Sequence, residues 1–428
     1  MIQNIFNPFN KPYNTIQIED LELLKDVCEG WNVEYKRETP KPSKIAKSIA
    51  SFANSHGGIY IIGVETSKET NKVIDIIGVD DLPDKIHDSV RGNLNPFPVF
   101  ETYSVILNTA KKVIIVVVAK GQDTPYIHND GRIYRRQESS SDPIFESNRY
   151  SIDELYKRKE ILEKEKESFR NIDYGFCEGE DDYPFLSVFI NTYPFNSFQI
   201  EDFFKKDKLN ALMSFFNTPF NISRTDSNKI TISGNLIFDS LNCYHNSVAL
   251  RYLEGLKLTY NSLTIELDAY GNFKALIPLA YSLYGIHTLP LDLEPYIEEF
   301  KIQDLEYIRF IDLQGLIKPM IGLFYHYFQY LLKEGFKDKL EFKFQTKNCY
   351  RTSLISGSEP YREYLNEFGI PICLKSSQYF PKFSNKLELE EILKDPVSSI
   401  LQYISYVVTA FGLPEHFSLP AFVADCNS

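Results

Sequence analysis

Two short runs of apolar residues constrain the fold of this chain more than any other feature. Residues 59–64 and 113–118 contain no charged side chain, which is typical of strands that are buried on both faces of a sheet. The first run follows Gly57-Gly58, and the segment 44–54 before it repeats apolar residues at helical spacing, with Ser43 as the expected N-cap. A helix that leads through a glycine turn into a buried strand predicts an α/β unit.

Shorter signals complete this first unit. Further predicted elements are strands at 32–37 and 132–136 and a helix at 84–93. Ser151 and Glu154 form an S-x-x-E capping box, and 153–170 combines Lys and Glu at helical spacing. The order of these elements predicts a mixed sheet, and the last helix is expected to be solvated and to close the domain.

The chain is expected to divide after this helix. Residues 171–184 combine two glycines with a cluster of acidic side chains, which is typical of a linker. The expected parts are an N-terminal extension at 1–20, an α/β domain with a mixed sheet at 21–170, the acidic linker at 171–184 and an α+β domain at 185–428. A length of 428 residues agrees with two or three domains.

The C-terminal part mixes both kinds of element. The predicted strands lie near 185–193, 229–238, 256–268 and 339–354, and the predicted helices near 199–216, 304–334 and 387–411. Residues 268–272 are expected to form a hairpin turn, and Pro319 is expected to kink the long helix. The charge-free stretch 396–414 carries polar residues along a helical pattern, so it predicts a buried amphipathic helix and not a membrane span.

Charge is distributed unevenly along the chain. The net charge is −12, but residues 1–170 hold 24 Lys and Arg against 26 Asp and Glu, so the acidity lies in the C-terminal part. Because the overall field repels phosphate, any contact with a polyanion has to come from a local basic patch.

Several enzyme classes lack their signature in this sequence. It contains no G-x-x-x-x-G-K-[ST], H-E-x-x-H, G-x-S-x-G or G-x-G-x-x-G motif. The six cysteines are scattered singly, which favours reduced thiols. No secretory signal is expected from the N-terminus, since it lacks a basic region followed by an apolar run. These features predict a soluble cytoplasmic protein without a membrane partner.

The segment 29–38 contains the residue pattern that most strongly indicates a chemical function. If 32–37 is a strand, Glu34 and Lys36 point to the same face. Glu65 follows the apolar run, at the edge where a buried sheet meets solvent and where α/β proteins often carry functional side chains. Carboxylates that converge there would be hard oxygen ligands for Mg²⁺ or Mn²⁺. Glu-x-Lys is also a common decoration of an exposed strand.

Basic residues gather in the same region. Five of them, interleaved with two prolines, fall between positions 36 and 47: Lys36, Arg37, Lys41, Lys44 and Lys47. They form either a phosphate-binding patch at the start of a helix or a solvated face.

Four segments resemble the AlbA-like domain of the Schlafen family. Residues 29–36, E-G-W-N-V-E-Y-K, stand beside the family pattern E-S-x-x-x-E-F-K. Residues 49–65, I-A-S-F-A-N-S-H-G-G-I-Y-I-I-G-V-E, are similar to A-F-A-N-T-x-G-G-x-x-x-I-G-V-D. Residues 125–126, P-Y, and 134–140, Y-R-R-Q-E-S-S, match P-Y and Y-x-R-x-G-S-S. The resemblance spans residues 21–150, about a third of the chain.

The resemblance implies a catalytic site. In Schlafen-like ribonucleases the first Glu, the Glu of E-F-K and the Asp after I-G-V form a carboxylate triad that holds a divalent metal and cleaves structured RNA such as tRNA. By position these residues are Glu29, Glu34 and Glu65, with Lys36 as the nearby cation. The departures from the family pattern are Gly30 in place of Ser, Glu65 in place of Asp, and Glu138 in place of Gly.

The leading hypothesis is therefore a metal-dependent endonuclease that acts on RNA, with tRNA as a natural substrate, in preference to DNA. Glu29, Glu34 and Glu65 would hold Mg²⁺ or Mn²⁺, and Lys36 would assist catalysis. The residues expected to contact phosphates are Lys36, Arg37, Lys41, Lys44, Lys47, Arg132, Arg135 and Arg136.

Two other hypotheses remain open. A non-catalytic nucleic-acid-binding regulator would have an affinity for nucleic acid that falls steeply with salt and does not depend on metal. An assembly module without nucleic acid is favoured by the net charge of −12. Under the leading hypothesis the acidic C-terminal domain would recognise a partner protein, sense a trigger or mediate a homodimer. An anti-phage role is an expectation by analogy with bacterial systems that carry such domains.

Overall fold

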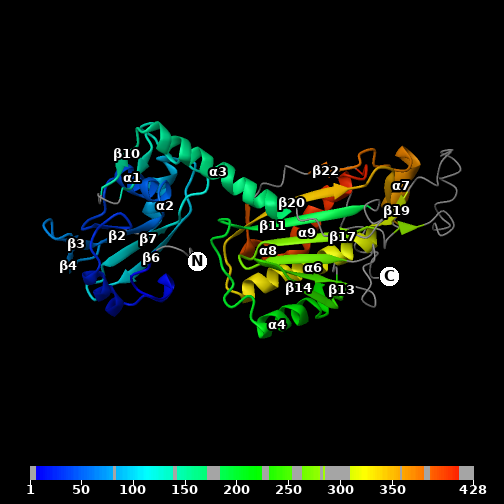
Figure 1. Ribbon diagram of the computed structural model, residues 1–428, viewed down its shortest axis with the longest axis horizontal. Coiled ribbons are helices and arrows are strands. Elements are labelled where there is room, and N and C mark those ends of the chain that lie inside the picture. The colour runs from blue at the N-terminus through cyan, green and yellow to red at the C-terminus, as the bar shows by residue number, and fades with distance from the viewer. Residues whose placement is uncertain are drawn as a thin grey trace. The chain divides into compact units, whose positions relative to one another are not determined.

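The computed structural model describes residues 6–80, 83–137, 142–170, 184–223, 231–252, 263–279, 283–284, 309–356, 359–379 and 386–413. The chain forms two compact units, Met1–Asn171 and Ile172–Ser428. Figure 1 shows the first unit from blue to blue-green and the second from green to red. All but the last residue of the expected linker at 171–184 lie outside the described residues.

The first unit is a mixed α/β domain, as the sequence predicted. Its elements are η1 (Tyr13–Thr15), η2 (Ile18–Asp26), β1 (Val33–Lys36), α1 (Pro42–Ala53), β2 (Gly58–Ile62), β3 (Val64–Thr66), β4 (Val73–Ile76), α2 (Asp84–Arg91), β5 (Leu94–Asn95), β6 (Phe100–Ile106), β7 (Lys112–Val118), β8 (Ile127–His128), β9 (Tyr134–Arg135), β10 (Ile144–Phe145) and α3 (Arg149–Arg170).

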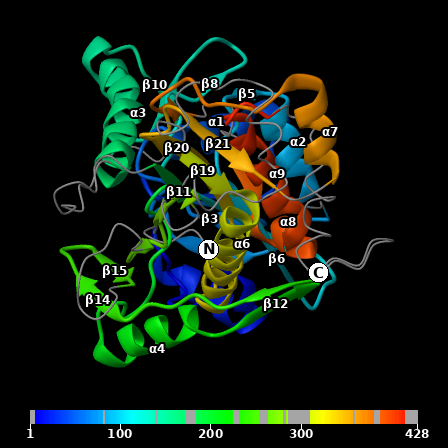
Figure 2. The ribbon, with the colours of Figure 1, turned by 90° about the vertical axis from the view of Figure 1, so that its right-hand side faces the viewer.

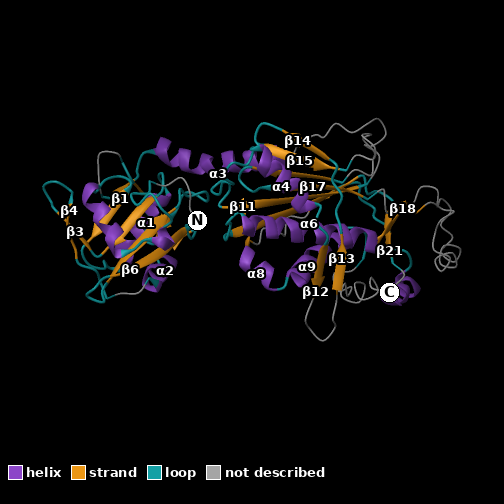
Figure 3. Ribbon diagram, turned by 90° about the horizontal axis from the view of Figure 1, so that it is seen from below, coloured by secondary structure: helices purple, strands orange, loops and turns teal. Residues whose placement is uncertain are grey.

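A four-stranded sheet in the order β1-β2-β7-β6 forms the centre of this unit. β1 runs parallel to β2, and β7 is antiparallel to both of its neighbours. Every residue of β2 is buried, because the sheet has a core on each face. Ile49 of α1 and Tyr60 of β2 belong to one core, and Leu24 of η2 and Ile61 of β2 belong to the other. Figure 3 shows α1 against the orange strands of this sheet.

The apolar run 59–64 was expected to form a single strand, and the structure corrects this expectation at Gly63. The φ of Gly63 is +99°, and a Cβ at this position would lie 2.8 Å from the Cα of Gly78. β2 therefore ends at Ile62, and β3 leaves the central sheet to pair with β4 in a separate two-stranded ribbon. Glu65 consequently lies in this ribbon and not at the edge of the central sheet.

Two predicted helices of the first unit are present with shifted starts. α1 has Lys41 as its N-cap residue and Pro42 at its first position, a place where proline is favoured because its missing N–H has no helical partner. The expected N-cap, Ser43, thus lies inside the first turn. The helix predicted from 153 is α3, which begins at Arg149.

The second unit is an α+β domain, as predicted. Its elements are β11 (Phe185–Tyr193), α4 (Lys206–Phe216), β12 (Phe220–Ser223), β13 (Thr231–Gly234), β14 (Ser240–Cys243), β15 (Ser247–Arg251), β16 (Thr264–Asp268), β17 (Phe273–Pro278), β18 (Leu283–Tyr284), β19 (Arg309–Asp312), α6 (Leu313–Lys333), β20 (Lys339–Lys347), β21 (Thr352–Ile355), α7 (Glu359–Phe368), β22 (Gln378–Tyr379), β23 (Lys386–Glu388), α8 (Leu389–Lys394) and α9 (Pro396–Thr409).

An eight-stranded sheet organises this second unit, in the order β14-β15-β16-β17-β11-β20-β22, with β23 also paired to β20. One face of the sheet carries Val188, Ile265 and Phe342, which share a core with α6, α8 and α9. Figure 2 shows α8 and α9 beside each other. The other face carries buried polar residues, among them the cross-strand partners Glu266 and Lys274.

Most predicted elements of the second unit are present. The strand at 185–193 is confirmed as β11, and the turn at 268–272 joins β16 to β17. Pro319 lies inside α6. The prediction of a single helix at 387–411 is wrong. The chain forms β23 and then two helices, α8 and α9, which are separated at Asp395-Pro396.

The strand expected at 339–354 is also interrupted. β20 ends at Lys347, and β21 begins at Thr352. Between them Asn348 and Arg351 have φ values of +57°, which a regular strand does not accommodate. The remaining predictions overlap shorter elements: 229–238 with β13, 199–216 with α4, 304–334 with α6, and the described end of 256–268 with β16.

In the parts of the chain that the structure describes, no helix has both the length and the apolar character needed to cross a membrane. The expected amphipathic helix after 396 is α9, whose apolar residues such as Ile400 and Ile404 are buried. Four cysteines lie in the described ranges, and all four are free thiols.

Candidate functional site

The candidate site lies on the face of β1 that turns toward α1. Val33 and Tyr35 enter the core on the η2 side of the sheet. Side chains alternate along a strand, so Glu34 and Lys36 project on the opposite side. Their charged ends are in contact, with Lys36 Nζ 2.7 Å from Glu34 Oε1, as the predicted alternation required.

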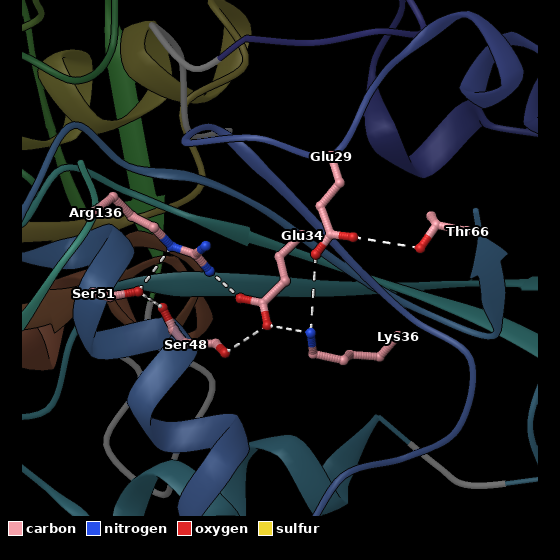
Figure 4. Close-up of polar contacts among 7 residues, drawn as sticks. All are labelled: Glu29, Glu34, Lys36, Ser48, Ser51, Thr66 and Arg136. Atoms are coloured by element: carbon pink, nitrogen blue, oxygen red, sulfur yellow. Dashed lines mark hydrogen bonds and ion pairs between the residues drawn. The ribbon is translucent and has the colours of Figure 1, made fainter. Parts of the chain in front are cut away.

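Glu34 is the most completely engaged carboxylate of the site. Its side chain is only 1% exposed. Oε1 accepts a hydrogen bond from Ser48 Oγ at 3.1 Å, in addition to its contact with Lys36. Oε2 forms an ion pair with Nη2 of Arg136 (Figure 4). A buried carboxylate requires such partners, because an isolated charge is costly to remove from water.

Arg136 is held against α1 by its side chain and its backbone. Its Nε donates to Ser51 Oγ at 3.0 Å, and its backbone N–H donates to Ser55 Oγ at 2.8 Å. The guanidinium lies 4.1 Å from the centre of the Phe52 ring. Arg136 was expected to contact phosphates, but its side chain is 1% exposed and its charge is paired with Glu34. The structure thus places it in the interior, which corrects that expectation.

Glu29 approaches the same lysine from the segment before β1. Its Oε1 lies 4.0 Å from Lys36 Nζ, and its Oε2 accepts a hydrogen bond from Thr66 Oγ1 at 3.4 Å. Burial raises the pKa of Glu29; Lys36 opposes this shift, and the negative charge of Glu34 adds to it. The ammonium of Lys36 therefore lies between two carboxylates, one of which is harder to ionise than usual.

Glu65 does not join this pair. Its Oε1 lies 2.8 Å from Nη1 of Arg37, and the two side chains are 32% and 61% exposed. The neighbouring residue on β3, Thr66, is the one that contacts Glu29, and the β3–β4 register shifts between Glu65 and Thr66. Among the residues placed by the structure, no group of three or more His, Cys, Asp or Glu is arranged to hold a metal ion.

The oxygen donors of the site have the chemistry that Mg²⁺ and Mn²⁺ prefer. The carboxylates of Glu29 and Glu34 and the hydroxyl of Thr66 are hard ligands. The two carboxylates already share one cation, the ammonium of Lys36. They fit a divalent ion provided that Lys36 moves aside, while Glu65 fits only if it leaves Arg37.

Three of the predicted phosphate-binding residues, Lys36, Arg37 and Arg136, are paired with glutamates as described above. The other five fall into two groups. Lys47 pairs with Asp130 at 3.2 Å and Arg135 with Glu146 at 3.4 Å, so these two charges are already compensated within the unit. The second group is exposed and forms no ion pair with the residues that the structure describes: Lys41, Lys44 and Arg132.

Sequence reasoning missed the hydroxyl groups of the site. Ser48 and Ser51 lie on the buried face of α1, among apolar residues. Polar side chains three positions apart on an apolar helix face indicate that each has a buried hydrogen-bond partner. Ser48 and Ser51 could therefore have been identified from the sequence. No comparable signal marks Thr66.

Comparisons with known proteins agree with this picture at the level of the domain. Residues 29–145 match the family model described as Schlafen, AlbA_2, which links the first unit to nucleic-acid-related functions. No curated protein matches the chain.

Two solved structures are similar over part of the chain. The DIP2311 protein of Corynebacterium diphtheriae is 21% identical, with a TM-score of 0.21, over 27% of this chain and 22% of that protein. The N-terminal domain of a RecG-related ATP-dependent DNA helicase protein from Nitrosomonas europaea is 24% identical, with a TM-score of 0.23, over 28% of this chain and 87% of that domain. This chain thus spans less than a quarter of the Corynebacterium protein.

Proposed function

We propose, on the premise that residues 29–145 form a Schlafen AlbA_2 domain, that this protein is a metal-dependent endonuclease that acts on RNA, with tRNA as its expected substrate. The observation that carries the proposal is the position of Lys36. Its Nζ lies 2.7 Å from Glu34 and 4.0 Å from Glu29, so two carboxylates converge on one cation beside the surface of the domain.

The proposed roles follow from this arrangement. Glu29 and Glu34 would hold Mg²⁺ or Mn²⁺, and Glu65 would join them after release from Arg37. Such an ion supplies an activated water and neutralises charge on the phosphate. Lys36 is 32% exposed, and once displaced from Glu34 it would place its positive charge on the scissile phosphate.

Binding of the RNA backbone is assigned to the exposed cations of the same unit. Lys41 and Lys44 lie at the start of α1, and Arg132 lies just before β9. Contacts of this kind fix the position of a nucleic acid without reading its sequence. Binding should therefore weaken steeply with salt.

The test is a cleavage assay on the full chain with tRNA, single-stranded DNA and double-stranded DNA, in Mn²⁺, Mg²⁺ or EDTA. Cleavage of tRNA should require the metal, and Glu29→Gln and Glu34→Gln should abolish it. The matched control is Glu69→Gln, which alters an exposed carboxylate outside the site and should cleave like the wild type. Cleavage in EDTA, or cleavage by Glu34→Gln, would contradict the assignment.

A specific observation favours a second candidate, a non-catalytic nucleic-acid-binding regulator. Both oxygens of Glu34 are engaged by Lys36, Ser48 and Arg136, so the network is satisfied without any ligand. This candidate expects RNA binding that falls with salt and is identical in Mg²⁺ and EDTA, with no cleavage in either. A gel-shift titration beside the cleavage assay separates the two candidates.

The role of the second unit stays a prediction. Recognition of a partner protein, sensing of a trigger and formation of a homodimer are all compatible with its acidic composition. The anti-phage role and the cytoplasmic location also stay predictions.

A further inference from the structure

A hollow of about 270 Å³ opens on the first unit, near the beginning of β1. It is lined by Phe6, Trp31, Asn32, His56, the Gly57–Gly58 turn and Lys120. The carbonyl of Asn32 accepts a hydrogen bond from the N–H of Ile59 at 2.9 Å, so the hollow lies where the β1–β2 ladder starts. Glu34 is two residues further along the chain, a rise of about 7 Å in a strand.

An aromatic pair forms one wall of the hollow. The rings of Trp31 and His56 lie 5.8 Å apart with an interplanar angle of 83°, so they meet edge to face. Trp31 is the only tryptophan of the chain, and 39% of it is exposed. An exposed indole in a recess, beside a second ring, offers a flat surface on which a nucleobase can stack.

The hollow is also lined by one cation, Lys120. Lys120 is exposed and has no ion pair with the residues described in this structure. Burial lowers the pKa of Lys120, and the neighbouring guanidinium of Arg158 lowers it further. None of the lining residues is acidic, so an anion in the hollow would meet only positive or neutral groups.

The two glycines of the lining, Gly57 and Gly58, have a structural role in the turn between α1 and β2. A Cβ at Gly57 would lie 2.7 Å from the carbonyl oxygen of Val118, and a Cβ at Gly58 would lie 2.3 Å from the Phe52 ring. They are required by packing between α1, β2 and β7. Recognition therefore depends on Trp31, His56 and Lys120.

We propose that this hollow binds one unpaired nucleobase and its adjacent phosphate, in a single-stranded segment of the RNA that occupies the Glu29–Glu34 site. The proposal rests on the proposed function for its substrate class. The base stacks on the indole of Trp31 with the perpendicular ring of His56 at its edge, and Lys120 binds the phosphate. An acidic peptide would use the lysine but leave the aromatic wall without a partner, so a nucleotide is the better match.

Trp31 makes the proposal directly measurable, because tryptophan emission reports on this one residue. The full wild-type chain is titrated in EDTA, where the RNA stays intact, with a short oligoadenylate RNA and with inorganic phosphate alone. Saturable quenching by the RNA, and none by phosphate, is expected. His56→Ala and Lys120→Ala should each weaken the binding on the order of tenfold, whereas Lys68→Ala, an exposed lysine outside the hollow, should leave it unchanged.

A second pair of variants distinguishes a loss of stacking from a loss of folding. Trp31→Phe keeps an aromatic surface, and Trp31→Ala removes it. Polarisation of a labelled oligoadenylate should show binding by Trp31→Phe within about twofold of wild type and a loss on the order of tenfold for Trp31→Ala. Equal binding by both variants, or RNA binding without quenching in the wild type, would overturn the proposal.

The outcomes also separate this inference from the nuclease. Quenching by RNA together with an absence of metal-dependent cleavage would leave the hollow established and the nuclease refuted. Metal-dependent cleavage together with unquenched Trp31 would do the reverse.

Discussion

The pair formed by Glu34 and Arg136 determines how single substitutions act at this site. Both side chains are 1% exposed, so neither charge has access to water as an alternative partner. Removing one member leaves the other buried and incompletely paired, which costs far more than the loss of an exposed ion pair. The site is therefore sensitive to changes that leave its exposed surface untouched.

Arg136→Met is expected to lower the free energy of unfolding by about 3–5 kcal/mol. The physical reason is the buried Glu34 carboxylate, which would keep only Lys36 and Ser48. Urea unfolding of the full chain measures the change. Arg132→Met serves as the exposed control and should shift stability by less than about 0.5 kcal/mol. Equal effects of the two substitutions would show that the buried pair carries no special cost.

Glu29 makes the stability of the first unit depend on pH. Its pKa is raised from the ordinary 4.5, chiefly by burial. Between 4.5 and the raised value the native state holds a proton that the unfolded state has released, so wild-type stability falls as pH rises through this window. Glu29→Gln removes the titration and should remove that part of the slope. Urea unfolding at a series of pH values tests this, and parallel profiles of the two proteins would contradict it.

Some residues of this site could be predicted from the sequence, and others could not. Alternation along β1 follows from backbone geometry, so it placed Glu34 and Lys36 on one face correctly. The partner of Glu34 could not be found in this way, because Arg136 is 102 positions away and reaches it only through tertiary packing. Arginine is usually exposed, whereas the side chain of Arg136 is buried against Glu34.

At the scale of elements, the break between β2 and β3 decides which carboxylates meet. The apolar pattern from 59 to 64 does not indicate this break, because it depends on the positive φ of Gly63 and on the close approach of Gly63 to Gly78. A local pattern cannot report a contact with a residue further along the chain. Glu65 is carried away from the central sheet as a result, and Thr66 is brought to Glu29.

Gly63→Ala tests this role of the break. Alanine at position 63 would have to adopt a positive φ, and its Cβ would lie 2.8 Å from the Cα of Gly78. We therefore expect a loss of about 1–3 kcal/mol in the free energy of unfolding. Gly131→Ala is the matched control, because Gly131 has a φ of +80° and no atom within 4 Å of its Cβ position. Chemical denaturation should show a smaller loss for Gly131→Ala. The same cost at both positions would mean that the approach to Gly78 is not the constraint.

At the scale of the whole molecule, the two units differ in charge. Residues 1–170 are close to neutral, with 24 basic and 26 acidic residues, whereas the whole chain carries −12. The acidic excess therefore belongs to the unit that does not contain the candidate site. Fold class could be predicted for both units, since it follows from element order, whereas the interruptions at 348–351 and 395–396 depend on local conformations that hydrophobic patterning does not encode.

A fragment that ends at Asn171, the limit of the first unit, is expected to bind RNA more tightly than the full chain at low salt. Removal of the acidic unit weakens the long-range repulsion of phosphate. The difference should vanish as salt rises, because the screening length falls to about 8 Å near physiological ionic strength. Filter binding of the fragment and the full chain across a salt series measures this. A fragment that binds less tightly would instead indicate that the second unit contributes to RNA recognition.

The ion pair between Glu34 and Arg136 has a consequence for how this domain can change over evolutionary time. Since each residue is the condition for burying the other, neither position can drift alone without an unstable intermediate. Substitutions at 34 and 136 should therefore be inherited together across related sequences, although 102 positions separate them. Lineages that replace the glutamate by an uncharged residue should also have lost the arginine, and an aligned family would display this as a correlated pair.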